Sequence, residues 1–219
     1  MTRIRMAPKD RERLIVDHAM SFFAEQGLDG QTRELARRLG ITQSLIYRYF
    51  PSKDALIDRV YEKWMHEFWN PCWYEWLVDR RQTLETRLTR FYRDYTRLCY
   101  NYVWVRLFAF SGLNGLDHHI RFVARNRTEI YPRIAGELRY EHGLPPLGEI
   151  PLTDFEMELL WGVHATAFYA GQRHWLFRLP APLDIDAVVT ARLRSFLATA
   201  PQQIAAHLAT LRNLKMASD

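Results

Sequence analysis

Four polar side chains lie close together in the stretch GITQSLIYRYFP: Gln43, Ser44, Tyr47 and Arg48. A Gln amide can pair with adenine through two hydrogen bonds, Arg can pair in the same way with guanine, and Ser can reach several base edges. A Tyr hydroxyl can donate to a phosphate oxygen. If one surface presents all four side chains, these residue types indicate nucleic-acid recognition.

The same stretch has the pattern of a helix of about two turns, which is too short to persist in water without tertiary packing. At about 100° per residue, the four polar residues fall on one side of this helix. The other side carries the apolar residues Leu45, Ile46, Tyr49 and Phe50. This apolar side must pack on neighbouring helices, which turns the polar side outward.

The neighbouring elements that hold this helix are also predicted to be helical. Periodic apolar residues in DRERLIVDHAMSFFAEQG indicate a first helix. Thr32 is expected to cap a second helix that ends at Gly40, and Thr42 to cap the third. A connection this short forces the second and third helices to cross at a large angle, as in a helix-turn-helix. Pro51 ends the third helix, and Ser52 can cap a fourth.

Helix N-termini suit phosphate oxygens because their amide groups have no partner within the helix. Thr32, Thr42 and Lys53 are expected at such ends. For the two threonines, capping and phosphate contact are compatible. For Lys53, the alternative is an ordinary exposed charge.

The segment TRELARRLGITQSLIYRYFPSKDALI resembles the N-terminal domain of the TetR family of transcriptional regulators, over roughly Lys9 to Val60. The matching features are the Thr that opens the second helix and the blocks ELARRLGIT, IYRYF and PSKDAL. The resemblance implies that Thr42, Tyr47 and Lys53 hold the DNA backbone. It places four further residues near bases or phosphates: Arg33, Gln43, Ser44 and Arg48. This chain has Ser44 and Leu45 where many members carry Gly and Thr.

Charge and composition agree with a partner of this kind. Hydrophobic residues make up 48% of the 219 residues, which is enough for a globular core, and the net charge is +5. The first 53 residues carry 10 Lys or Arg against 6 Asp or Glu, an excess that favours a polyanion although a solvated surface is equally compatible. Arg3, Arg5 and Lys9 form either a basic arm or a solvated tail. No apolar run is long enough for a membrane span or a signal peptide, so we expect a cytoplasmic protein.

The remaining chain also has helical patterning, with predicted helices in residues 84–110, 117–143, 153–179 and 184–200. No Val-, Ile- or Thr-rich run alternates with the period of a strand. The predicted fold is therefore all-α: a three-helix helix-turn-helix head in residues 1–53, joined to a larger helical effector-binding and dimerisation domain in residues 54–219.

Aromatic residues concentrate in the middle of the chain, where 15 of the 30 fall between Tyr61 and Phe110. TetR-like proteins use this region as a ligand chamber, and aromatic walls suit a hydrophobic or planar effector. The candidate ligand-binding residues are Trp64, Trp104, Phe108, His164 and Phe168. A bulky core without a ligand is the alternative for each of them.

Five histidines lie later in the chain: His118, His119, His142, His164 and His174. They show no spacing typical of metal ligands, and no HExxH-like signature is present. We therefore predict no metal, no cofactor and no catalytic residue, and we do not expect an enzyme. An enzyme that uses the histidine- and aromatic-rich region remains a rival interpretation. It would need a convergent acid, base or metal that the sequence does not display.

The last two long helices, roughly Thr153 to Leu179 and Asp184 to Thr199, are expected by resemblance to form a homodimer contact. Small residues in the first of them permit close helix approach, and an apolar stripe follows the second; packing within one subunit is the alternative. The expected partner of a two-fold dimer is double-stranded DNA with a palindromic operator. The third helix of one subunit would then lie about 34 to 36 Å from the third helix of the other. The sequence thus predicts a repressor released by a small hydrophobic or aromatic effector, or a similar regulator without an effector.

Overall fold

The computed structural model describes residues 7–180 and 184–216, and within these ranges every regular element is helical, as predicted. The chain folds into two compact units. The first unit contains Met1–Trp69 and Asn101–His119, and the second contains Asn70–Tyr100 and Ile120–Asp219. Arg3 and Arg5, which the sequence assigned to a basic arm, lie outside the described residues.

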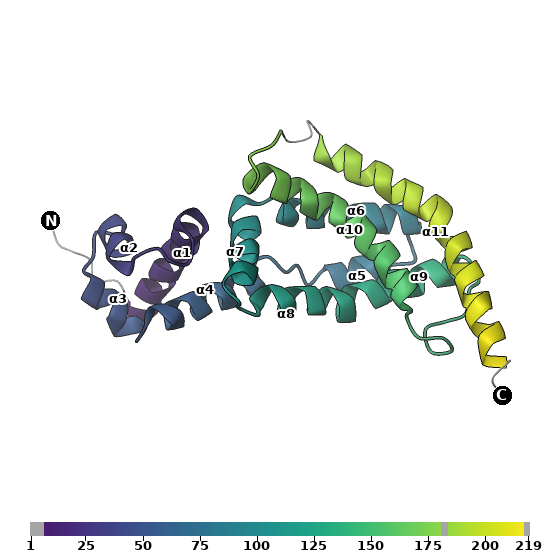
Figure 1. Cartoon of the computed structure of the whole chain (residues 1–219), viewed down its shortest axis with the longest axis horizontal. Helices are drawn as coiled ribbons and strands as arrows, with labels where there is room; N and C mark the ends of the chain where they lie inside the picture. Colours follow the sequence, from purple (N-terminus) through teal and green to yellow (C-terminus); the bar gives the residue numbers. More distant parts are fainter. Residues whose placement is uncertain (1–6, 181–183, 217–219) are drawn as a thin grey trace. The chain divides into compact units, whose positions relative to one another are not determined.

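The first unit is built on α1 (Pro8–Gln26), which packs against α4 (Lys53–Glu67) and α7 (Tyr102–Leu113). The short helices α2 (Thr32–Arg38) and α3 (Gln43–Tyr49) meet each other beside α1 (Figure 1). The core of α1 is a stripe that includes Ile15, Ala19 and Phe23, all without solvent exposure. Leu56 and Val60 of α4 are buried as completely. The predicted first four helices are therefore confirmed.

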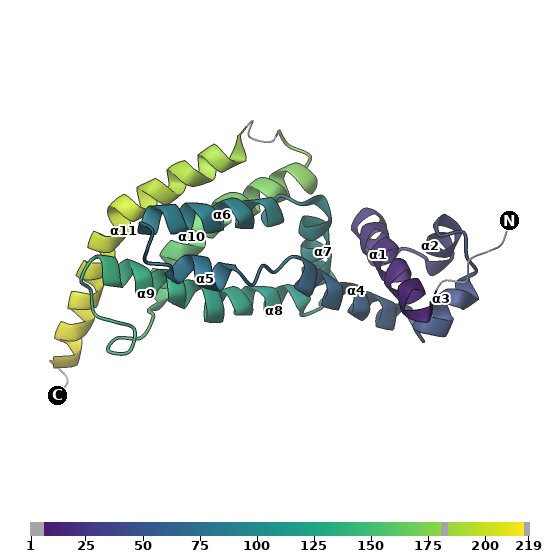
Figure 2. The ribbon, with the colours of Figure 1, turned by 180° about the vertical axis from the view of Figure 1, so that it is seen from behind.

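The second unit consists of α5 (Trp73–Val78), α6 (Leu84–Cys99), most of α8 (His118–Arg125), the π-helical turn η1 (Asn126–Ile130), α9 (Tyr131–Glu141), α10 (Asp154–Trp175) and α11 (Ile185–Met216). Helices α10 and α11 run side by side, and both pack on α6 (Figures 1 and 2). A capping box starts α10, because Thr153 and Glu156 each bind the other's backbone N–H.

The prediction of one continuous helix over residues 84–110 is wrong. The chain breaks between α6 and α7, at Tyr100 and Asn101. The Asn101 side chain accepts a hydrogen bond from the backbone N–H of Trp104 at 3.0 Å, which caps the start of α7. Asn competes with helical hydrogen bonding in a helix interior and is favoured at a cap, so it starts a new helix here.

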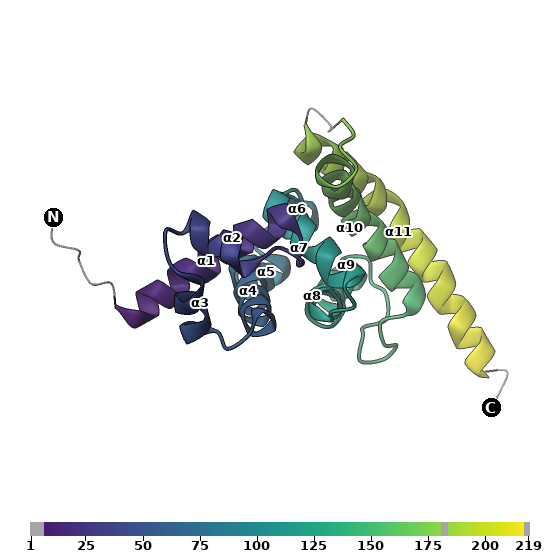
Figure 3. The ribbon, with the colours of Figure 1, turned by 60° about the vertical axis from the view of Figure 1, so that its left-hand side comes forward.

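The predicted end of the last helix near Thr199 is also wrong, since α11 continues through Pro201 to Met216 (Figure 3). Proline removes one backbone donor and normally interrupts a helix. Buried residues recur every three or four positions on both sides of Pro201: Val189, Leu193, Phe196, Ala200, Ile204 and Leu208. This continuous apolar stripe offsets the missing hydrogen bond and holds both halves of the helix to the unit.

The predicted boundary between residues 53 and 54 coincides with the start of α4. The whole of α4 belongs to the first compact unit, because its apolar side packs on α1. Lys63 of α4 adds an ion pair to Asp17 of α1. The first unit therefore extends past the helix-turn-helix. The assignment of DNA binding to residues 1–53, and of ligand binding and dimerisation to residues 54–219, remains a prediction.

Candidate nucleic-acid interface

The inner side of α3 anchors it to the rest of the first unit. Ile46 and Phe50 are buried, and Leu45 and Tyr49 are half-buried. The turn before α3 depends on Gly40, whose φ of +64° lies in the left-handed region that favours glycine. No atom would crowd a side chain at this position, so the requirement is conformational.

Thr42 caps α3 as predicted. Its Oγ1 accepts a hydrogen bond from the backbone N–H of Leu45 at 3.3 Å, and its backbone is extended, as at most N-caps. The same oxygen lies 3.0 Å from Oγ of Ser44, which is exposed on the outer side. Ser52 caps α4 in the same way by accepting from the N–H of Ala55 at 3.0 Å, and Lys53 then opens that helix.

Thr32 has a different role from the cap that the sequence predicted. It is the first residue of α2, Gln31 stands at the N-cap without a side-chain bond, and Thr32 itself is buried. Its Oγ1 lies 3.0 Å from Oη of Tyr47 and accepts a hydrogen bond from Nε2 of Gln43 at 2.8 Å. We call these three residues the Thr32 cluster. It joins α2 to α3, because Gln43 and Tyr47 follow Thr32 by 11 and 15 positions in the sequence. Sequence reasoning selected all three residues but gave no signal that they touch.

Two arginines on the outer side are free of ion pairs within the described part of the chain: Arg33 of α2 and Arg48 of α3, both exposed. The nearby carboxylate of Glu34 does not compensate them, because it pairs with Arg37 at 2.7 Å and Arg38 at 3.2 Å. Hydrogen bonds from Arg37 and then Arg38 lower the pKa of Glu34 to about 2. The outer face therefore keeps unneutralised positive charge.

The aromatic residues predicted to bind a ligand fall into two groups. Trp64 and Trp104 are fully buried in the first unit, with ring centroids 5.9 Å apart, and Phe108 stacks 5.1 Å from Trp104. His164 and Phe168 lie one helical turn apart on α10, in the second unit.

His164 sits within an aromatic cage that the sequence did not reveal. Its Nδ1 lies 2.9 Å from Oη of Tyr92, and the rings of Tyr95 and Tyr131 are each 4.6 Å away. Burial lowers the pKa of His164 to about 3, so the imidazole is neutral at physiological pH. Its buried Nε2 has no hydrogen-bond partner among residues 7–180 and 184–216.

Among the described residues, no group of three or more His, Cys, Asp or Glu side chains is arranged to hold a metal ion. In the same part of the chain, no helix combines the length and hydropathy needed to cross a bilayer.

The short helix α3 packs across α2 and has a polar outer side. This arrangement is that of a helix-turn-helix domain. Residues 15–60 match the model of the bacterial regulatory proteins of the tetR family. Over this segment, the chain is similar to the DNA-binding domain of TetR-family transcriptional regulators.

A curated relative is also similar to part of this chain. The uncharacterized HTH-type transcriptional regulator YuxN of Bacillus subtilis is 38% identical to it over 50 residues. That match spans 22% of this chain and only 17% of the relative.

Solved structures extend the likeness in fold to most of the chain. The fatty acid degradation regulator FadR from Bacillus halodurans has a TM-score of 0.60 at 17% identity, covering 88% of this chain and 96% of its own. A TetR family transcriptional regulator from Pseudomonas syringae pv. tomato has a TM-score of 0.56 at 19% identity, covering 89% and 97%. At these identities, the likeness concerns the fold alone.

Proposed function

We propose that this chain is a sequence-specific DNA-binding regulator in which α3 enters the major groove. The observation that carries the proposal is the division of α3 into two sides. Ile46 and Phe50 hold the helix to the first unit, while Ser44 and Arg48 are exposed beside the unneutralised charge of Arg33. An exposed arginine without a carboxylate partner is available for a guanine edge or a phosphate.

The other polar residues have positioning roles in this proposal. Thr42 and Lys53 lie at helix starts, where a phosphate can approach both the side chain and the backbone N–H groups. The Thr32 cluster orients the Tyr47 hydroxyl and the Gln43 amide before DNA arrives. Such contacts with the backbone fix the register of α3, and the base contacts then supply the specificity.

The proposed functional form is a homodimer through α10 and α11 on a palindromic operator. Several large side chains of α10 are partly exposed, including Trp161 at 36% and Tyr169 at 53%, and Val188 of α11 is 40% exposed. By contrast, most of the apolar stripe of α11 packs within its own unit, so it does not support the dimer. A second copy that covers the exposed side chains would complete a helical bundle.

Release from the operator by a small hydrophobic or aromatic effector is the regulatory part of the proposal. Within the second unit, the aromatic cage around His164 supplies the apolar surroundings that such a ligand needs. The mechanism is linkage: a ligand that lowers operator affinity by some factor must itself bind the operator complex more weakly by the same factor. Equal affinity of the ligand for the free chain and for the operator complex would contradict the effector role.

Selection of bound duplexes from a random pool at low salt tests the DNA-binding proposal directly. We expect a palindrome whose half-sites are one DNA turn apart. Arg48→Ala should relax the preference at one base position by about 1–3 kcal/mol. Arg59→Ala is the matched control, because it removes the same charge from the exposed surface of α4. Failure to enrich any palindrome would overturn the proposal, and a uniform loss in Arg48→Ala would assign Arg48 to a phosphate.

A further inference from the structure

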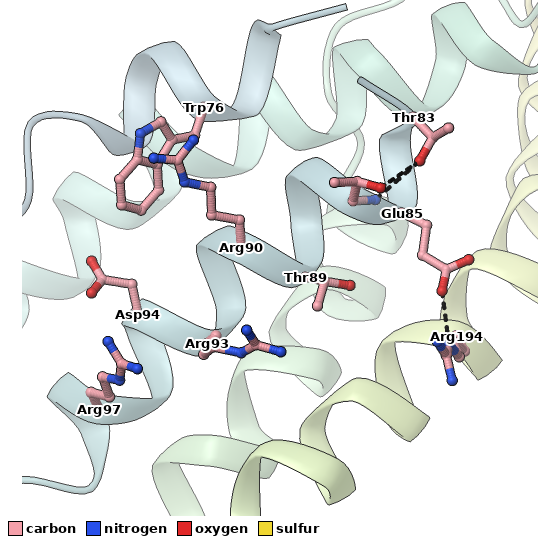
Figure 4. A pocket seen from close by; sticks show the side chains of 10 residues that line it. Trp76, Thr83, Glu85, Thr89, Arg90, Arg93, Asp94, Arg97 and Arg194 are labelled. Atoms are coloured by element: carbon pink, nitrogen blue, oxygen red, sulfur yellow. Dashed lines mark hydrogen bonds and ion pairs between the residues drawn. The ribbon is translucent and has the colours of Figure 1, made fainter. Parts of the chain in front are cut away.

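The second unit carries an open groove of about 750 Å³ that plays no part in the proposed DNA contact. Figure 4 shows its floor, the outer face of α6, with Trp76 of α5 near one end and Arg194 of α11 near the other. A volume of this size is typical of small-molecule sites, which run from about 300 to 1,000 Å³. The groove therefore has room for a compact ligand.

Arginine dominates the lining of this groove. Arg90, Arg93 and Arg97 recur at helical spacing along one face of α6, and Arg194 adds a fourth guanidinium from α11. Only two lining residues are acidic, so the lining has four positive and two negative charges, a net +2. Like charges three and four residues apart on a helix repel one another. An anion that bridges them would relieve this repulsion.

The two carboxylates of the groove do little to neutralise the arginines of α6. Asp94 accepts hydrogen bonds from neutral donors, Nε1 of Trp73 and Nδ2 of Asn70, at 2.8 Å each. Glu85 pairs instead with Arg194 of α11, at 2.7 Å.

The α6 arginines are correspondingly short of partners. Arg93 comes no closer than 4.0 Å to Asp186, the limit of an ion pair. Arg97 has no ion-pair partner in the ranges that the structure describes. The guanidinium of Arg90 lies flat against a neutral ring, 4.0 Å from the centre of Trp76. Within the described residues, none of these three exposed arginines is paired with a carboxylate at a distance below 4.0 Å.

We propose that this groove binds a small anion that carries at least two phosphate or carboxylate groups. The planar fork of a guanidinium matches both groups with two parallel hydrogen bonds. Exposed Thr83 and Thr86 add hydroxyls at the end of the groove near Glu85. Glu85 and Asp94 interrupt the positive surface, which disfavours a long polyanion and favours a compact one. The proposal depends on the second unit alone and is independent of DNA binding.

Titration calorimetry of the full chain without DNA, at constant ionic strength, tests this site with two probes, pyrophosphate and citrate. We expect one anion per chain and a higher midpoint of thermal unfolding when it is bound. Arg93→Ala with Arg97→Ala should weaken binding at least tenfold. The matched control, Arg81→Ala with Arg127→Ala, removes the same charge from exposed positions of the same unit and should change affinity less than twofold.

A second pair of variants separates guanidinium geometry from charge. Arg93→Lys with Arg97→Lys keeps both charges but loses the forks, so it should weaken binding several-fold while leaving the helix intact. The stronger of the two probes then identifies phosphate or carboxylate as the preferred group. Absence of binding by both probes, equal weakening in the alanine and control doubles, or binding of heparin alone would overturn the proposal.

Discussion

Two arginines, Arg48 of the first unit and Arg139 of the second, lie in opposite environments. Arg48 of α3 is exposed and has no ion-pair partner in the described part of the chain. Arg139 of α9 has no solvent exposure, and both oxygens of Glu156 accept from its guanidinium, at 2.7 and 2.5 Å. The guanidinium of Arg48 is thus available to an outside partner, whereas that of Arg139 is fully engaged inside the protein.

The buried arginine also fixes the connection between α9 and α10. Its Nη1 donates to the carbonyl oxygens of Pro145 and Ile150, at 3.0 and 2.6 Å. Burial raises the pKa of Glu156, but hydrogen bonds from Arg139 and Thr153 outweigh this effect and lower it. Arg139 therefore uses buried charge to hold a loop in place, whereas the charge of Arg48 on α3 has no carboxylate partner within the described residues.

Arg139→Ala should produce the largest effect and tests the structural side of this comparison. Without its partner, the Glu156 carboxylate stays buried and uncompensated, at a cost of about 3–5 kcal/mol in the free energy of unfolding. Urea unfolding followed by circular dichroism measures the loss. Arg81→Ala, whose side chain is 89% exposed, should change stability by less than about 0.5 kcal/mol. A loss in Arg139→Ala no larger than in this control would refute the structural role.

His164 offers a second test of burial in the same unit, through the pH dependence of stability. Its pKa is about 3 in the folded state against 6.5 for the free side chain, so the unfolded chain binds a proton first as pH falls. The contribution of His164 is complete above pH 6.5 and declines towards pH 3. Between pH 7 and pH 5, we expect a loss of about 2 kcal/mol.

Urea unfolding at both pH values, compared between the native chain and His164→Asn, isolates this contribution. The variant should lose about 2 kcal/mol less than the native chain over the same interval. His142→Asn, at an exposed position, is the matched control and should behave like the native chain. An identical pH dependence in all three proteins would mean that His164 titrates normally in the folded state.

The sequence predicted the fold where local rules act alone. Gly40, Thr42, Ser52 and Pro51 mark helix boundaries by their own backbone preferences, and all four act as expected. The predicted end of the last helix near Thr199 is wrong, because the continuation of α11 through Pro201 depends on apolar packing that only the folded chain provides. Local signals are thus reliable unless tertiary contacts oppose them.

The candidate interface shows the same limit. The outward position of Ser44 and Arg48 follows from helical period and could be predicted from the sequence. The Thr32 cluster could not be predicted, because contact between residues 11 and 15 positions apart depends on the crossing of α2 and α3. The cage around His164 likewise joins α6, α9 and α10, so no local pattern announces it.

Tyr47→Phe should give the smallest change in the free energy of unfolding. It tests whether one hydroxyl at the candidate interface contributes both to folding and to DNA binding. Thr32 Oγ1 accepts from Gln43, so its own O–H can donate to the Tyr47 oxygen, and the Tyr47 O–H can then donate to a phosphate in the proposed complex. Loss of the hydroxyl should cost about 0.5–1.5 kcal/mol in unfolding free energy and weaken DNA binding equally on all sequences. Tyr49→Phe, on the same helix, is the control for urea unfolding and duplex titrations. Lower stability with unchanged DNA affinity would show that the hydroxyl only joins α2 to α3.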